Sequence, residues 1–86
     1  MPEVTVYTAS FCGFCLQVTA LLERRGIPYT ERSVEDEPDL REKLLARSGR
    51  RTLPQVYVGE RYIGGAEELR ALDASGGLLQ LMKTEE

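Results

Sequence analysis

The sequence predicts an α/β fold in which a four-stranded mixed β-sheet is flanked by helices. A strand pattern, a helical pattern and a second strand pattern follow one another near the N-terminus, within the roughly 30 residues of a βαβ unit with parallel strands. Two short strand patterns, residues 55–58 and 61–63, are separated by the turn Gly59-Glu60 and indicate an antiparallel hairpin. A sheet that joins both units is mixed, and helices then cover its two faces.

The first three elements follow from local patterns. Residues 3–8 are rich in β-branched and aromatic side chains that alternate, which predicts a strand. A helix is expected over residues 14–22, because its apolar residues recur at helical spacing and Gly26 and Pro28 then end it. Those apolar residues are Phe14, Cys15, Val18, Leu21 and Leu22. Residues 28–34 predict the second strand.

The second half of the chain adds three helices around the hairpin. Acidic residues and a proline at residues 36–38 are typical of a helix N-terminus, and Gly49 is typical of its end. Gly64-Gly65 opens the next helix, and a last helical piece follows residues 75–77. The leucines expected to face inward are Leu40, Leu44 and Leu45 in the first of these helices and Leu69 and Leu72 in the second.

Length and charge narrow the functional classes. The 86 residues fit one domain, residues 1–86, and the net charge is -3. An acidic chain argues against nucleic acid or an anionic membrane surface as the main partner, since both select a basic excess. No run of 18 apolar residues predicts a membrane span, and the first residues lack a signal-peptide pattern. We therefore expect a cytoplasmic protein with neither partner.

The motif Cys12-Gly13-Phe14-Cys15 carries the chemistry that the sequence predicts. The chain has two cysteines and no histidine, and this C-x-x-C lies between the first strand and the first helix, a context typical of a thioredoxin-like redox site. A helix N-terminus stabilises a thiolate, which is the reactive form of cysteine. Residues at i and i+3 share a helix face. Cys12 is therefore expected to attack a substrate disulfide, and Cys15 to release the product.

Three other interpretations of the cysteines remain open at this point. A structural zinc site needs four ligands, and the chain supplies two cysteines and no histidine. A structural disulfide would close a loop of only two residues, which removes little entropy from the unfolded chain. The two cysteines could also be incidental core residues.

The segment Thr52-Leu53-Pro54 directly precedes a predicted strand. A central strand rarely contains proline, so Pro54 is expected at the start of the strand, where X–Pro bonds are often cis. Backbone held open beside the cysteines would offer N–H and C=O groups to an extended peptide.

Basic residues gather just before this segment. Five of the eleven lysines and arginines fall within residues 41–51, and they are Arg41, Lys43, Arg47, Arg50 and Arg51. This patch is either a solvated helix face or an anion site, and Gly64-Gly65 at a helix N-terminus is a second candidate anion site. Two anion sites beside a thiolate suit a small thiol peptide with two carboxylates, such as glutathione.

With these motifs the chain resembles the glutaredoxin family, and most closely its small bacterial dithiol members, the glutaredoxin 3 type. The matching stretches are Val6-Tyr7-Thr8, Cys12-Gly13-Phe14-Cys15, Arg47-Ser48-Gly49-Arg50, Thr52-Leu53-Pro54-Gln55, Ile63-Gly64-Gly65 and Leu72-Asp73-Ala74-Ser75-Gly76-Gly77-Leu78. The resemblance implies a thioredoxin fold with a cis proline at Pro54. It also implies an enzyme that reduces protein disulfides and glutathione mixed disulfides, with glutathione as electron donor.

The resemblance assigns roles by position. It implies that Cys12 is the nucleophile, that Cys15 is the resolving cysteine, and that the two form a redox disulfide. The glutathione-binding residues that it implies are Thr52, Leu53, Pro54, Gly65, Ala66 and Glu67. The implied partners are glutathione and disulfide-bonded or glutathionylated proteins, with ribonucleotide reductase a weaker candidate.

Two departures from the family pattern add expectations. Ala9 stands where the family tends to place a lysine that pairs with a glutathione carboxylate, and we expect Arg51 to supply that charge. Gly13-Phe14 is the pair found between the active-site positions of monothiol members, some of which hold a [2Fe–2S] cluster between two subunits. The alternative function is therefore a cluster carrier or sensor, dimeric and with Cys12 as a metal ligand. Otherwise we expect a monomer without a metal site.

Overall fold

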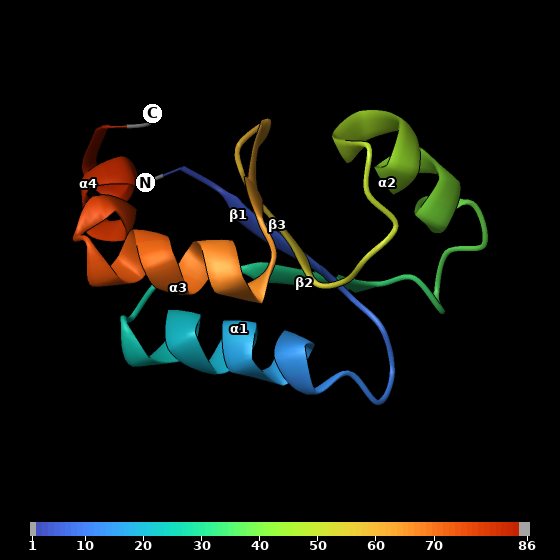
Figure 1. The fold of residues 1–86 in the computed structure, drawn as a ribbon, viewed down its shortest axis with the longest axis horizontal. Helices are drawn as coiled ribbons and strands as arrows, with labels where there is room; N and C mark the ends of the chain where they lie inside the picture. The colour runs from blue at the N-terminus through green and yellow to red at the C-terminus, as the bar shows by residue number, and fades with distance from the viewer. Residues whose placement is uncertain (1, 85–86) are drawn as a thin grey trace.

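A four-stranded mixed sheet with strand order β2-β1-β3-β4 forms the centre of the computed structural model, which describes residues 2–84 (Figure 1). The elements are β1 (Val4–Thr8), α1 (Gly13–Arg24), β2 (Thr30–Ser33), α2 (Leu40–Ser48), β3 (Gln55–Val58), β4 (Arg61–Gly64), α3 (Ala66–Ala74) and α4 (Gly77–Thr84). Strand β1 is parallel to β2 and antiparallel to β3, and β3 pairs antiparallel with β4. The predicted fold class is thus confirmed.

Helices cover both faces of the sheet and create two cores. On one face α1 and α3 lie side by side and α4 follows, whereas α2 lies on the other face (Figure 1). The first core buries Leu22, Leu69 and Leu78 against β1 and β3. The second core packs α2 against Tyr7 and Tyr57, whose rings meet edge to face with centroids 5.4 Å apart. Among residues 2–84 no helix has the length and apolar character needed to cross a membrane.

Helix α2 begins at Leu40, later than the predicted start within residues 36–38. The acidic residues before it serve other contacts. Glu35 accepts hydrogen bonds from Ser10 and Ser33, and Glu37 pairs with Arg32. These contacts hold residues 34–36 in a turn after β2, so that the helix starts only beyond Pro38. The predicted end at Gly49 is confirmed, with Gly49 in the left-handed conformation (φ 77°).

Three side chains expected in the core, Phe14, Leu45 and Leu72, lie partly outside it. Phe14 is 57% exposed, although Cys15, Val18, Leu21 and Leu22 on the same stripe are buried. Phe14 belongs to the first turn of α1, where it borders an open cavity instead of the sheet. Leu45 is half-buried on α2, whereas Leu40 and Leu44 are fully covered.

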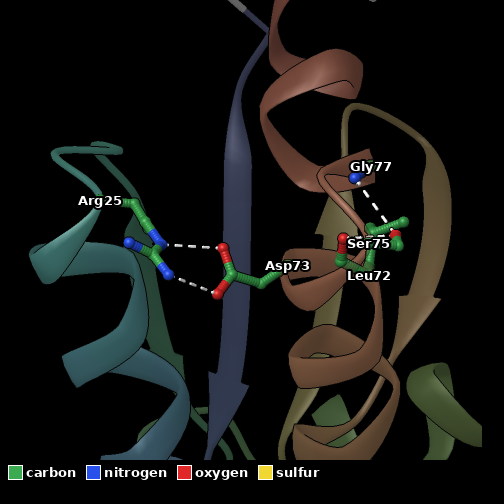
Figure 2. A network of polar contacts seen from close by, with 5 residues as sticks. All are labelled: Arg25, Leu72, Asp73, Ser75 and Gly77. Carbon is green, nitrogen blue, oxygen red and sulfur yellow. Dashed lines mark hydrogen bonds and ion pairs between the residues drawn. The ribbon is translucent and has the colours of Figure 1, made fainter.

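An ion pair ties the C-terminal end of α1 to α3. The Arg25 guanidinium donates two hydrogen bonds to the Asp73 carboxylate, at 2.8 and 2.9 Å (Figure 2). Figure 2 also shows how α3 ends, with the Ser75 hydroxyl donating to the Leu72 carbonyl and accepting from the Gly77 N–H. The hydrogen bonds from Arg25 hold the pKa of Asp73 below its ordinary value. The two helices that border the cysteines are therefore joined at their far ends.

Removal of this carboxylate charge should weaken the fold in a pH-dependent way. A lowered pKa stabilises the folded state in full above the ordinary aspartate value of about 3.9, and this stabilisation is lost as the pH falls through the folded-state pKa. Asp73→Asn is thus expected to lower the urea midpoint at pH 7, and the gap to the wild type should close in acid. Asp36→Asn, in the exposed turn after β2, is the matched control. Equal midpoint losses in both variants would contradict a specific role for the ion pair.

Candidate active site

Cys12 is the N-cap residue of α1. Its backbone is extended (φ -114°, ψ 103°), and its Sγ accepts a hydrogen bond from the Cys15 N–H at 3.2 Å. The sulfur thus takes the place that a serine or aspartate oxygen occupies at most helix N-caps. A hydrogen bond from a backbone N–H is stronger when its acceptor is charged, and the helix dipole adds to it. The N-terminus of α1 therefore directs a backbone donor and the positive end of the helix dipole at the Cys12 sulfur.

Cys15 lies beneath Cys12 and is only 4% exposed. Burial, followed by its hydrogen bond with Cys12, raises the pKa of the Cys15 thiol to about 12. Cys15 therefore remains a thiol at neutral pH, whereas Cys12 is partly exposed at the N-terminal end of the helix. Both cysteines are free. The two sulfurs thus differ as a nucleophile and a resolving thiol should differ.

The loop before Cys12 presents an exposed aromatic side chain. Phe11 has a left-handed backbone (φ 54°), which is rare for an aromatic residue, and its side chain is fully exposed. The side chains of Phe14 and Leu16 are also exposed on this end of α1. Three exposed apolar side chains therefore lie within four residues of Cys12 along the chain.

A groove of about 320 Å³ runs from the cysteine loop to the N-terminus of α3. Its lining residues are Phe14, Arg50, Thr52, Leu53, Pro54, Gly65, Ala66, Glu67, Glu68 and Arg70. The groove begins beside the reactive sulfur, since Cys12 Sγ lies 3.9 Å from the Leu53 carbonyl oxygen. The Leu53–Pro54 peptide bond is cis, as the family resemblance implied.

All six residues that the resemblance placed in a glutathione site line this groove, but Arg51 does not. Arg51 lies in a separate depression with Arg41, Glu42 and Leu45. Arg50 and Thr52 line the groove, whereas Arg51 between them lines the other depression.

Phe14, Glu68 and Arg70 also line the groove although they were not predicted as site residues, and Arg50 was predicted only as one member of the basic patch. One signal was available: Arg70 lies three and four residues after Glu67 and Ala66, so a helix brings these side chains to one face. No comparable signal distinguishes Arg50 from Arg51, because that choice depends on the path of the loop.

A buried side chain fixes the loop that carries Arg50 and Thr52. Gln55 is completely buried, and its Nε2 donates to the Arg50 and Thr52 carbonyl oxygens at 2.9 and 3.1 Å. Its Oε1 accepts from the Tyr57 hydroxyl at 3.1 Å. A buried amide with three partners is costly to disrupt. The groove wall is therefore preorganised by β3.

The opposite end of the groove is a capped helix N-terminus. The Glu68 carboxylate accepts from the Gly65 N–H at 2.7 Å, which is half of a capping box. This backbone hydrogen bond lowers the pKa of Glu68. Gly64 has φ 131°, and a Cβ there would lie 2.6 Å from the Glu68 Cβ. The close approach of backbone and carboxylate requires this glycine.

Comparison with known proteins identifies the family. The sequence model of the family described as glutaredoxin matches residues 4–63. The chain belongs to the glutaredoxin family. It is 40% identical over 83 residues to glutaredoxin 3 of Escherichia coli strain K12, with 96% of this chain and all of that protein covered. These matches make it a thiol–disulfide oxidoreductase, with Cys12 and Cys15 as its C-x-x-C motif.

Solved glutaredoxin structures share its thioredoxin fold. The glutaredoxin of Brucella melitensis is 38% identical with a TM-score of 0.87, and the match covers all of this chain and 94% of that one. A buckwheat glutaredoxin–glutathione complex is 27% identical with a TM-score of 0.89, covering 95% of this chain and 77% of that one. The fold predicted from the motifs is therefore the fold of the family.

Proposed function

We propose that this glutaredoxin reduces glutathione mixed disulfides and protein disulfides through Cys12 and Cys15, with glutathione as electron donor. The observation that carries the proposal is the groove, which starts at Leu53 beside Cys12 Sγ and ends at the N-terminus of α3. The proposal is supported by the buckwheat relative, whose solved structure is a complex with glutathione.

The charges of the groove suit glutathione. Two arginines, Arg50 and Arg70, and two acidic side chains, Glu67 and Glu68, line it. Glutathione carries two carboxylates and one ammonium group on a peptide of three residues. Arginine recognises carboxylates through paired donors, and a carboxylate accepts from an ammonium group. Both signs of charge in the groove therefore have a counterpart on the peptide, and its thiol would lie at the Cys12 end.

Reduction of a glutathione mixed disulfide needs only Cys12. The Cys12 thiolate attacks the glutathione sulfur, and the other sulfur leaves as a thiolate that takes a proton from water. A second glutathione thiolate then attacks the glutathione held on Cys12. This step forms glutathione disulfide and returns the Cys12 thiolate, a leaving group that the helix N-terminus stabilises.

Reduction of a protein disulfide adds Cys15. Attack by Cys12 leaves the substrate bound to Cys12 through a mixed disulfide. Cys15 then attacks Cys12 Sγ, the Cys12–Cys15 disulfide forms, and the substrate leaves with two electrons gained. Two glutathione molecules reduce the new disulfide in turn.

A coupled assay tests the proposed function. Glutathione, glutathione reductase and NADPH are mixed with a small glutathione mixed disulfide, and NADPH oxidation is followed with and without the protein. We expect saturable turnover that is proportional to protein concentration. A folded protein without turnover in this assay would overturn the proposal.

Arg50 and Arg51 offer a matched pair of variants for the groove. Arg50→Ala should raise KM for a glutathionylated peptide by about 5- to 30-fold with little change in kcat, because one charge-assisted contact is worth about 1–2 kcal/mol in binding. Arg51→Ala removes the same charge outside the groove and should leave KM within about twofold. Equal KM changes in the two variants would contradict the assigned geometry.

Free thiols fit a reducing compartment, so we propose a cytoplasmic location. Ribonucleotide reductase stays one candidate among protein substrates. Within residues 2–84, no three histidine, cysteine, aspartate or glutamate side chains come together as a metal site. The [2Fe–2S] alternative would join Cys12 residues of two chains, and we do not advance it as a second function.

A further inference from the structure

A second cavity reaches the cysteines from the side of α1 that faces β2. Its volume is about 350 Å³, and its lining residues are Ala9, Phe11, Cys12, Gly13, Cys15, Leu16, Thr19 and Glu31. Both sulfur-bearing residues belong to it, whereas neither belongs to the groove described above. Glu31 is the one charged residue among those that line it.

Sheet register places Glu31 on the cysteine side. Glu31 of β2 pairs with Val6 of β1, and Val6 is buried in the core beneath α1. Thr8 is two residues further on, so its side chain points to the same face. The buried Thr8 hydroxyl donates to Glu31 Oε2 at 2.9 Å and fixes the carboxylate there.

In the resolving step the Cys15 thiol must lose its proton, and the Glu31 carboxylate is placed to accept it. Cys15 must become a thiolate to attack Cys12 Sγ, yet it is buried and its thiol holds its proton at neutral pH. Two of the influences that raise its pKa come from Cys12, but burial, the largest, persists when Cys12 carries a substrate. A base within reach of the proton, directly or through one water, would speed the attack.

We propose that Glu31 is the proton acceptor for Cys15 in the resolving step of the proposed oxidoreductase function. The Cys15 proton passes to the Glu31 carboxylate, directly or through a water in the second cavity. The Cys15 sulfur bonds to Cys12 Sγ, the bond from Cys12 to the substrate breaks, and the substrate sulfur leaves with the electron pair. Glu31 is an exposed residue, so it returns the proton to solvent.

Among ionisable groups, Cys12 and then Glu31 have the largest effects on the pKa of Cys15. The Glu31 charge also raises the pKa of Tyr29, which lies just before β2, but the Tyr29 hydroxyl donates a hydrogen bond to Glu23 at 2.6 Å. Glu23→Gln therefore removes a nearby negative charge outside the second cavity and is the matched control for Glu31→Gln.

The test separates the two thiols with a coloured disulfide, dithiobis(nitrobenzoate), in a stopped-flow instrument. Cys12 attacks first and releases one nitrothiobenzoate, and Cys15 then displaces the second from Cys12. We expect Glu31→Gln to leave the first phase unchanged and to slow the second about 100-fold at pH 7, which is the low end of general-base effects. The slowed phase should then accelerate with pH more steeply than in the wild type.

If Glu31 acted only through its charge, Glu31→Gln would speed the second phase instead of slowing it. The Glu31 charge raises the pKa of Cys15, so loss of that charge alone would ease ionisation and speed the second phase. A faster or unchanged second phase in Glu31→Gln, or an equal slowing in Glu23→Gln, overturns the proposal. Glu31→Asp, which keeps a carboxylate, should recover part of the rate. Absence of the first phase in the wild type would instead overturn the proposed role of Cys12.

Discussion

Replacement of Cys12 by serine is expected to lower turnover by more than about 10³-fold with every disulfide substrate, because a serine hydroxyl is not ionised at neutral pH. Both proposed routes begin with attack by Cys12, so neither survives the change. Cys12 lines the second cavity, and its sulfur lies 3.9 Å from the carbonyl oxygen of Leu53, which lines the groove. No other thiol can replace it, since Cys15 is buried and protonated.

The Cys12→Ser variant should fold normally, which makes the result interpretable. Serine is a favoured N-cap residue, and its Oγ can accept the Cys15 N–H that Cys12 Sγ accepts now. The coupled glutathione assay gives the activity, and circular dichroism with a urea titration gives the stability. Ser10→Ala, two residues away in the same loop, serves as the control that should keep full activity. Substantial turnover by a folded Cys12→Ser variant would contradict the assignment of the nucleophile.

The chemistry of this site could be predicted from the sequence because it depends on local structure. A C-x-x-C between a strand and a helix places one sulfur at a helix N-terminus wherever the fold takes it, and Cys12 is the N-cap of α1 as expected. The position of Pro54 directly before β3 follows from the missing N–H of proline, which a central strand cannot spare. Such features need only a few neighbouring residues to be interpreted.

Features that depend on tertiary contacts could not be predicted from the sequence. Whether Arg50 or Arg51 enters the groove depends on the loop path that Gln55 fixes from the core. The start of α2 depends on Arg32, which pairs with Glu37 across the turn. Glu31 becomes relevant only through the register that sets β2 against β1. The first two outcomes involve partners only three to five residues away, but the folded path of the loop selects them, and the third depends on a strand that is distant in sequence.

Replacement of Cys15 should separate the two proposed routes. Cys15→Ser is expected to retain at least about half of the turnover with a glutathione mixed disulfide and to lose at least about 10²-fold with a protein disulfide. The first route uses Cys12 and a second glutathione, whereas the second needs an internal thiol to free Cys12 from the substrate. The two rates are measured in the coupled assay, with a glutathionylated peptide and with a disulfide-bonded protein whose reduction is followed by its fluorescence.

Burial of position 15 calls for a second substitution beside serine. Cys15 is 4% exposed, and a serine hydroxyl there costs about 1–3 kcal/mol if it finds no partner. Cys15→Ala leaves no polar group to bury and should give the same split between substrates. Removal of the Cys15 thiol leaves the hydrogen bond from the Cys15 N–H to Cys12 Sγ in place, because the donor of that bond is the backbone. If both variants lost the two activities in equal proportion, Cys15 would be acting on the reactivity of Cys12 and not on the release of protein substrates.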